Sequence, residues 1–314
     1  MGSTGFGMKE NQPSTTAENL AAVRAFEAMR PQREQICSDV YARRFLSDRF
    51  TRPHNLMQRL FRVLDGWETV VPGVCGSILA RTRFIDDCLA NAIENNIGQL
   101  VILGAGYDTR ALRFEALKEK VKVFEIDHPE TQQYKLERLK DFSADLDGYV
   151  TYIPIDFEEK DFGKKLLSHG YNKELRTFFI WEGVTYYLSE KAVDDTLSFI
   201  ARNSKVGNEI VFDYFPASIV AGACEVPEAG PLFRILKNFG ERIRFGIRPE
   251  KIADFLNERG FEIVQNLGSD DYKEAYFKEK TGLGRTVSRL FFFVHATVAR
   301  SITAQSPRKN YLTS

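Results

Sequence analysis

Short apolar runs alternate with charged, helix-forming segments between residues 97 and 215. The runs are LVIL (100–103), KVFEI (122–126), VTYIPI (150–155), TFFIWE (177–182) and EIVFDYF (209–215). Runs of this length and composition favour buried strands, and the segments between them favour crossover helices. Crossovers of this kind join parallel strands and are right-handed. We therefore expect an α/β fold around a mostly parallel sheet with helices on both faces.

Two further runs near the C-terminus extend the expected sheet to seven strands. They are FEIVQNLG (261–268) and RLFFFVHATVA (289–299), and we predict that they pair antiparallel at the sheet edge. Residues 216–248 mix Gly, Pro and apolar residues, which indicates an insertion over the carboxyl ends of the strands. A helix is expected over 249–260, and the tail 301–314 is expected to be disordered.

The first 96 residues are predicted to be helical. One helix is expected to begin near Thr16, a second to cover about 55–70 and a third to cover 76–96. Arg81 lies on the apolar stripe of the third helix, and a charge on the inward side of a helix needs a partner. We divide the chain into a helical cap region (1–96), a core (97–300, with 216–248 as a cap insertion) and a tail (301–314).

Composition excludes several classes of protein. The chain has 43 basic and 43 acidic residues, so nothing indicates nucleic acid or an anionic membrane as a partner. The four cysteines form no CxxC pair, so neither a zinc site nor a disulfide framework is predicted. No apolar run approaches the ~20 residues of a membrane span, and the N-terminus lacks the pattern of a secretory signal. We expect a soluble, cytoplasmic protein without a metal centre; oligomeric state is not readable from these patterns.

A glycine loop, Gly104-Ala105-Gly106, follows the first strand and precedes a helix. Ligands of open α/β sheets bind at such strand ends. A dinucleotide-binding loop reads GxGxxG, whereas here Thr109 replaces the third glycine and Asp108 precedes it. A carboxylate beside a pyrophosphate costs on the order of a few kcal/mol. The loop therefore favours S-adenosylmethionine, which has a sulfonium cation and no phosphate, over the alternative of NAD.

Acidic residues end the next three strands. Asp127 lies 21 residues after Gly106 and can accept hydrogen bonds from ribose hydroxyls, a role shared with NAD sites. Asp156 can accept from an adenine amino group, and Glu182 is expected to point into the same crevice. Together with Asp108 they predict an acidic pocket around a cationic ligand, although solvated acids at strand ends are a simpler explanation for each residue alone.

Eight motifs occur in fixed order within the stretch from about Thr15 to Ala299. They are STTAENLAAVRA, SDVYARRFL, ARTRFIDD, VILGAGYDTRALRF, FEIDHPETQ, IPIDFEE, WEGVTYYLSE and GERIRFGI. Together they resemble the leucine carboxyl methyltransferase family, including its bacterial S-adenosylmethionine-dependent members. Val40 departs from the proline that bacterial members usually carry. The resemblance implies a Rossmann-like class I methyltransferase with S-adenosyl-L-methionine as cofactor.

The resemblance also implies roles for individual residues. The expected cofactor contacts are Arg81 and Arg43 (or the adjacent Arg44) for the methionyl carboxylate, Gly104 and Gly106 with Ala105 between them for the methionyl part, Asp127 for the ribose, Asp156 and Phe157 for the adenine, and Glu182 near the methionyl end. Asp108 completes this predicted set. Tyr187 matches a tyrosine near the acceptor carboxylate in eukaryotic members, or it is simply a wall tyrosine; we name it with Arg81 as a catalytic candidate.

The chemistry of methyl transfer favours a carboxylate acceptor. A carboxylate is already ionised at pH 7, because its unperturbed pKa is ~4, so no general base is required. A phenol or alcohol would need a base or a metal, and the four histidines are poorly placed for that task. We predict O-methylation of a small-molecule carboxylate. The alternatives are an NAD-dependent oxidoreductase, methylation of a protein C-terminal carboxylate or a phenolic hydroxyl, and a protein of this fold that binds without catalysis.

Overall fold

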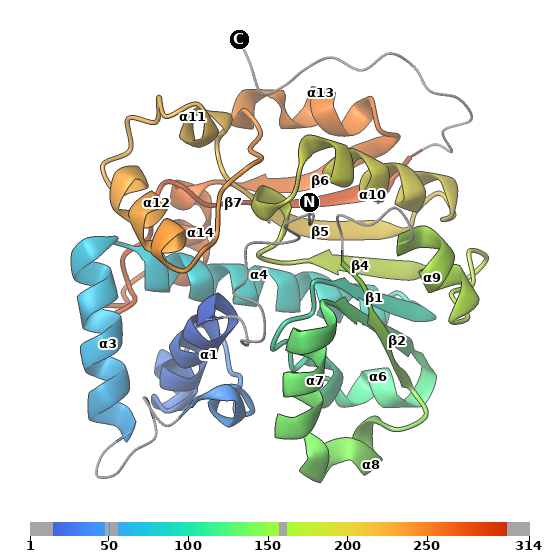
Figure 1. Cartoon of the computed structure of the whole chain (residues 1–314), viewed down its shortest axis with the longest axis horizontal. Helices are drawn as coiled ribbons and strands as arrows, with labels where there is room; N and C mark the ends of the chain where they lie inside the picture. Colours follow the sequence, from blue (N-terminus) through green and yellow to red (C-terminus); the bar gives the residue numbers. More distant parts are fainter. Residues whose placement is uncertain (1–14, 48–49, 51–55, 157–161, 300–314) are drawn as a thin grey trace, which may run out of the picture.

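The computed structural model describes residues 15–47, 50, 56–156 and 162–299 (Figure 1). Its centre is a seven-stranded sheet in the order β3-β2-β1-β4-β5-β7-β6. The strands are β1 (Gln99–Leu103), β2 (Lys122–Asp127), β3 (Val150–Pro154), β4 (Thr177–Trp181), β5 (Glu209–Tyr214), β6 (Phe261–Leu267) and β7 (Phe292–Val298). β1 to β5 are parallel, and β7 is antiparallel to both β5 and β6. The predicted α/β fold with a mostly parallel seven-stranded sheet is confirmed.

Helices precede, connect and cover these strands. The α-helices are α1 (Thr15–Ala28), α3 (Leu56–Val70), α4 (Val74–Glu94), α5 (Arg110–Arg113), α6 (Glu115–Lys120), α7 (Pro129–Arg138), α8 (Ser143–Leu146), α9 (Phe162–Ser168), α10 (Glu190–Arg202), α11 (Ala217–Val220), α12 (Ala229–Asn238), α13 (Ile252–Asn257) and α14 (Ser269–Tyr276). The 3-10 helices are η1 (Gln32–Glu34), η2 (Ala42–Phe45), η3 (Lys140–Phe142), η4 (Thr185–Tyr187) and η5 (Pro249–Lys251). The predicted insertion carries α11 and α12, and the predicted tail lies outside the described residues. In the described part of the chain, none of the helices is both long and apolar enough to cross a membrane.

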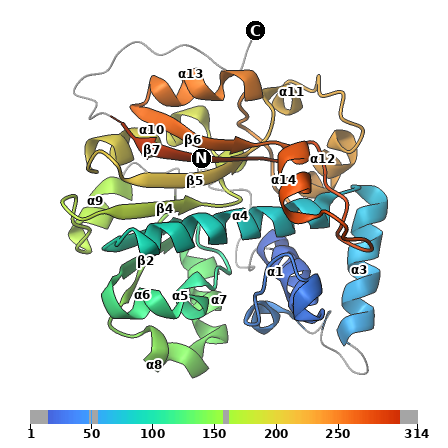
Figure 2. The ribbon, with the colours of Figure 1, turned by 180° about the vertical axis from the view of Figure 1, so that it is seen from behind.

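The sheet is covered by different helices on its two faces. Side chains alternate along β1, so Leu100 and Ile102 join the core shared with α4, whereas Val101 and Leu103 join the core shared with α10 and α13. All five residues of β1 are buried, as expected for a central parallel strand. Figure 2 shows α4 crossing one face of the sheet, with α1 and α3 beside it. The N-terminal helices are thus held next to the strand ends through α4.

A glycine near the start of α4 lets that helix approach another part of the chain. A Cβ atom at Gly76 would lie 1.8 Å from the carbonyl oxygen of Thr286 and 3.2 Å from that of Gly284. No ordinary packing allows so short a separation. Gly66 in α3 is different, because a Cβ atom there would meet no atom within 4 Å.

These two helical glycines give opposite predictions for the same substitution. We expect Gly76→Ala to lower the free energy of unfolding by about 1–3 kcal/mol, because the added methyl overpacks the contact with Thr286. We expect Gly66→Ala to raise it by roughly 0.5–1 kcal/mol, because alanine is the better helix former. Urea denaturation of both variants measures the two changes. Equal effects of the two substitutions would contradict the close packing of α4.

Candidate functional site

The glycine loop between β1 and α5 has a fixed backbone. Gly104 and Gly106 have φ angles of +68° and +45°, the left-handed region that favours glycine. The N–H groups of Gly104 and Ala105 donate to the carbonyl of Ile126 at 2.8 and 3.0 Å. A Cβ atom at Gly104 would collide with the side chain of Val184. The loop is therefore held between the end of β2 and the segment that follows β4.

Asp127, at the end of β2, faces this loop. Its Oδ2 accepts from the N–H of Gly106, and its Oδ1 accepts from the N–H of His128 at 2.6 Å. Burial raises the pKa of Asp127, and the two backbone N–H groups oppose that rise. Two nearby polar atoms, the Tyr107 hydroxyl and His128 Nδ1, are buried and find no hydrogen-bond partner among the described residues. Buried polar atoms are normally satisfied, so these two beside a carboxylate fit a site for a polar ligand.

A buried ion network joins α4 to the glycine-loop segment and to the ends of β4 and β5. Its members are Arg81, Asp86, Asp108, Arg110, Glu182 and Asp213. Arg81 donates from Nε to Glu182 at 3.0 Å and from Nη1 to Asp213 at 2.6 Å. Arg110 donates to the other oxygen of Glu182 at 2.8 Å, and also to Asp86 and Asp108. Glu182 thus bridges two arginines.

The charge states within the ion network follow from its geometry. Burial raises the pKa of Glu182, but Arg110 and Arg81 outweigh that effect and lower it to about 2. Burial lowers the pKa of Arg81, but Asp213 and Glu182 raise it well above its ordinary value. Arg81 is only 1% exposed and stays a cation. A charge on the apolar stripe of α4 requires a partner. For Arg81 that partner is a pair of carboxylates.

The network corrects one expectation from the sequence. Asp108 and Glu182 do not form an uncompensated acidic pocket, because the side chain of Arg110 binds both of them. Pairing with Arg110 also weakens the electrostatic argument that Asp108 excludes a phosphate. The sequence reasoning missed Asp213 and Arg110. Their signals were an acid inside the apolar run EIVFDYF and the last residue of GAGYDTR.

Arg43 and Asp156, which the sequence also predicted as cofactor contacts, are not members of the ion network. Arg43, in η2, is exposed and borders a separate hollow with Tyr41, so the structure does not bring it to Arg81. Instead Arg24 of α1 reaches the glycine loop and donates to the carbonyl of Tyr107 at 2.8 Å. Asp156 is half-buried just beyond β3, and Phe157 lies outside the described residues.

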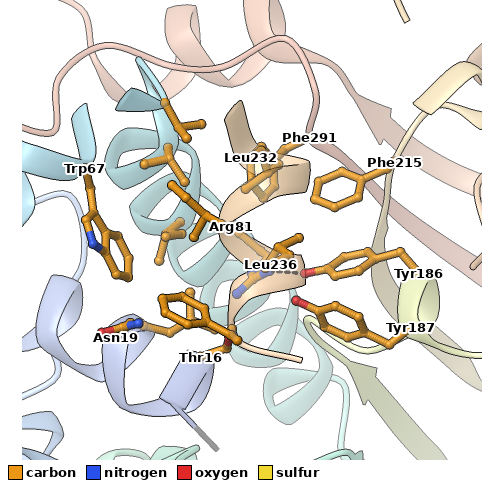
Figure 3. Close-up of a pocket in the computed structure, with 16 residues that line it drawn as sticks. Thr16, Asn19, Trp67, Arg81, Tyr186, Tyr187, Phe215, Leu232, Leu236 and Phe291 are labelled. Atoms are coloured by element: carbon orange, nitrogen blue, oxygen red, sulfur yellow. Dashed lines mark hydrogen bonds between the residues drawn. The ribbon is translucent and has the colours of Figure 1, made fainter. Parts of the chain in front are cut away.

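A pocket beside Arg81, here called the Arg81 chamber, has an empty volume of about 590 Å³ including its open mouth (Figure 3). It is lined by Thr16, Asn19, Leu20, Trp67, Val71, Val74, Ile78, Arg81, Tyr186, Tyr187, Phe215, Leu232, Ile235, Leu236, Phe239 and Phe291. Among these described residues Arg81 alone is charged. Figure 3 shows the hydroxyls of Tyr186 and Tyr187 directed toward Arg81, which donates from Nη1 to the Tyr186 hydroxyl at 3.4 Å.

The hydroxyl proton of Tyr187 already has a partner within the protein. The hydroxyl donates to the carboxylate of Glu241, which follows α12, and burial raises the pKa of both groups. A phenol has one proton, so Tyr187 cannot at the same time donate to a ligand. In the part of the chain that the structure describes, no three His, Cys, Asp or Glu side chains gather where they could hold a metal ion.

Comparison with known families matches residues 17–201 to the leucine carboxyl methyltransferase family. One similar protein is YktD of Bacillus subtilis, named as a candidate S-adenosyl-L-methionine-dependent methyltransferase. It is 30% identical over 202 residues, which are 64% of this chain and 66% of that protein. A relative from Mycobacterium sp. (strain JLS) with the same kind of name is 29% identical over 91% of this chain and 94% of its own length. The matches with the first three relatives cover 55 to 66% of those proteins, less than two thirds.

Solved structures share the fold at low sequence identity. A candidate methyltransferase from Thermobifida fusca superposes with a TM-score of 0.60 at 16% identity, covering 93% of this chain and 97% of that one. A DUF574 family protein from Streptomyces avermitilis gives 0.57 at 13% identity, covering 87% and 99%. Structural similarity at such low sequence identity shows only that these proteins share the fold.

Replacing Glu182 by glutamine tests the ion network through its pH dependence. The folded pKa of about 2 lies below the ordinary 4.5, so the carboxylate contributes stability above pH 4.5 and loses it as pH falls toward 2. We expect Glu182→Gln to lower the free energy of unfolding at pH 7 by on the order of 3 kcal/mol, because two buried arginines lose a partner. The deficit should shrink as pH falls below 4.5, because Glu182 of the unfolded wild-type chain then takes up a proton while the folded carboxylate stays ionised until about pH 2.

Urea denaturation between pH 7 and pH 3.5 measures this change. The matched control is Glu174→Gln, a surface position 65% exposed, where we expect a change within about 0.5 kcal/mol. A deficit that stays constant across the pH range would contradict the assigned charge of Glu182.

Proposed function

The chain belongs to the leucine carboxyl methyltransferase family of S-adenosyl-L-methionine-dependent methyltransferases, and we propose that it methylates a carboxylate oxygen of a small molecule. The observation that carries the proposal is the position of Arg81. Its guanidinium bonds to Glu182 in the network that includes the glycine-loop segment, and it also lines the chamber. A methyl donor at the loop and an acceptor in the chamber would meet at this residue.

The residues around the glycine loop fit S-adenosyl-L-methionine. Each oxygen of Asp127 accepts one backbone N–H and keeps capacity to accept a ribose hydroxyl. The unsatisfied Tyr107 hydroxyl and His128 Nδ1 beside it suit a polar ligand. We propose Asp156 and Phe157 for the adenine, the backbone of residues 104–106 for the methionyl chain, and Glu182 near its end.

Arg81 is proposed to hold the methionyl carboxylate with the part of its guanidinium that the protein leaves available. Nε and Nη1 bond to Glu182, Asp213 and Tyr186, whereas Nη2 makes no hydrogen bond among the described residues. We retain Arg43 only as a second proposed contact, although its side chain is exposed in this structure. Arg24, which binds the loop carbonyl of Tyr107, is better placed for that role.

The reaction requires the protein to orient the donor and the acceptor and to exclude water. S-adenosyl-L-methionine supplies an electrophilic methyl group on a sulfonium, so the protein does not need to activate the donor. An acceptor carboxylate is ionised at neutral pH and needs no base. Tyr187 keeps its proton because burial and the Glu241 carboxylate raise its pKa. We propose that Tyr187 positions the acceptor as a wall of the chamber while the ion network keeps Arg81 charged and fixed.

Binding of the methyl donor is the first expectation to check. Calorimetric titration should give saturable binding of S-adenosyl-L-methionine and none of NAD. Asp127→Ala should weaken donor binding tenfold to a hundredfold, because a hydrogen bond to a charged group, about 1.5–3 kcal/mol, is lost. Asp147→Ala, at an exposed position in the turn before β3, is the matched control and should bind like wild type. Undiminished binding by Asp127→Ala would contradict the ribose assignment.

The chemistry of the product tests the carboxylate acceptor. Methyl esters hydrolyse in mild base, whereas methyl ethers of phenols do not. With donor labelled on its methyl group, we expect the label in the product to be released as methanol on alkaline treatment. Label that survives this treatment would show transfer to a hydroxyl or nitrogen and would refute carboxyl methylation.

A further inference from the structure

The Arg81 chamber has one polar end and an apolar body. Polar side chains meet at one end, namely Thr16 and Asn19 of α1, Arg81 of α4, and Tyr186 and Tyr187 of η4 (Figure 3). The remaining lining residues are aliphatic or aromatic and come mostly from α3, α4 and α12. A ligand that fills the chamber therefore meets polar groups at one end and hydrocarbon along the rest of its length.

The length of the apolar body follows from helix geometry. Val74, Ile78 and Arg81 lie on one face of α4, at positions i, i+4 and i+7. At a rise of 1.5 Å per residue, Val74 lies ~10 Å along the helix axis from Arg81. Leu232 and Leu236 of α12, with Phe239 directly after the helix, repeat the same spacing. Two helices thus present apolar side chains over about the same length.

Charge decides how many ionised groups the ligand can carry. Arg81 is the one charged residue of the described lining; at the far end Val71 and Val74 are apolar, and Trp67 offers one neutral indole N–H and no opposite charge. Burying a second charge there is strongly unfavourable, and so is burying peptide amides without hydrogen-bond partners. Both a dicarboxylate and the C-terminal segment of a protein fit the apolar body poorly.

We infer that the acceptor is a small monocarboxylic acid with an apolar body about as long as the α4 segment from Val74 to Arg81. This inference rests on the carboxyl methylation proposed above. The acid lies with its carboxylate at the Arg81 end and its hydrocarbon part between α4 and α12. A carboxylate oxygen forms a bond to the donor methyl carbon as the carbon–sulfur bond breaks and its electron pair stays on sulfur. The products are a methyl ester and S-adenosylhomocysteine, and no proton moves.

A series of unbranched acids tests this with the wild-type protein. With saturating S-adenosyl-L-methionine, kcat/KM is measured for acetate, butanoate, hexanoate, octanoate and decanoate from the formation of S-adenosylhomocysteine. Burying one methylene contributes ~0.8 kcal/mol, so we expect kcat/KM to rise about fourfold per methylene until the chamber is filled. Octanedioate should be at least about tenfold poorer than octanoate, because its second carboxylate would be buried unpaired.

Shortening the chamber provides an independent test. Val74→Phe places a ring at the far end, and we expect the preferred acid to become shorter while butanoate is still methylated. The matched control is Val70→Phe, a position 48% exposed at the end of α3 and outside the chamber, where the preference should not change. Titration with S-adenosyl-L-methionine checks that each variant is folded. If Val74→Phe does not bind S-adenosyl-L-methionine, the chain-length series with the wild-type protein alone tests the inference.

The outcomes separate this inference from the proposed function. Methylation that is independent of chain length, equal for octanedioate and octanoate, or stronger for a peptide C-terminus would overturn the apolar acceptor and leave carboxyl methylation standing. Donor binding without methylation of any acid would overturn carboxyl methylation itself, and this inference with it.

Discussion

The buried guanidinium of Arg81 needs charged partners, and the elements around it must supply them. A charge at 1% exposure is tolerated only with partners, and those partners are Glu182 after β4 and Asp213 in β5. Their positions fix α4 against the carboxyl ends of the central strands. Because Glu182 also binds Arg110, the segment after the glycine loop belongs to the same assembly. One set of ion pairs thus holds together the loop, the long helix and the polar end of the chamber.

The wider arrangement of charges suits a cationic ligand. Besides the ion network, Arg113 binds Asp86 and Arg24 binds Asp39. The connected groups are four guanidinium groups and five carboxylates, one more negative than positive. A donor with a net positive charge balances this excess, and the neutral product that remains after methyl transfer does not. Without the donor, the excess negative charge of these groups opposes binding of an anionic acceptor. The bound cationic donor removes that repulsion.

Sequence patterns predicted the parts of the site that depend on the sheet alone. Parallel strands end at a common edge, so the glycine loop after β1 and the acids after β2 and β4 had to lie near one another. The roles assigned to them remain proposals. Patterns could not reveal that Arg110 compensates Asp108 and Glu182, because that depends on the rotamer of one long side chain. Nor could they show that Arg24 approaches the loop while Arg43 faces solvent, since this depends on how the N-terminal segments pack against the rest of the protein. The chamber was hidden because α12 is far along the chain from α1, α3 and α4, which it faces across the cavity.

A crystal structure with S-adenosylhomocysteine would test most directly the claim that Arg81 lies between a donor site and an acceptor chamber. We predict the ribose hydroxyls on Asp127, the amino-acid carboxylate on Arg81 and the sulfur facing the polar end of the chamber. A ligand whose sulfur faces away from the chamber, or one bound away from the glycine loop, would contradict the account.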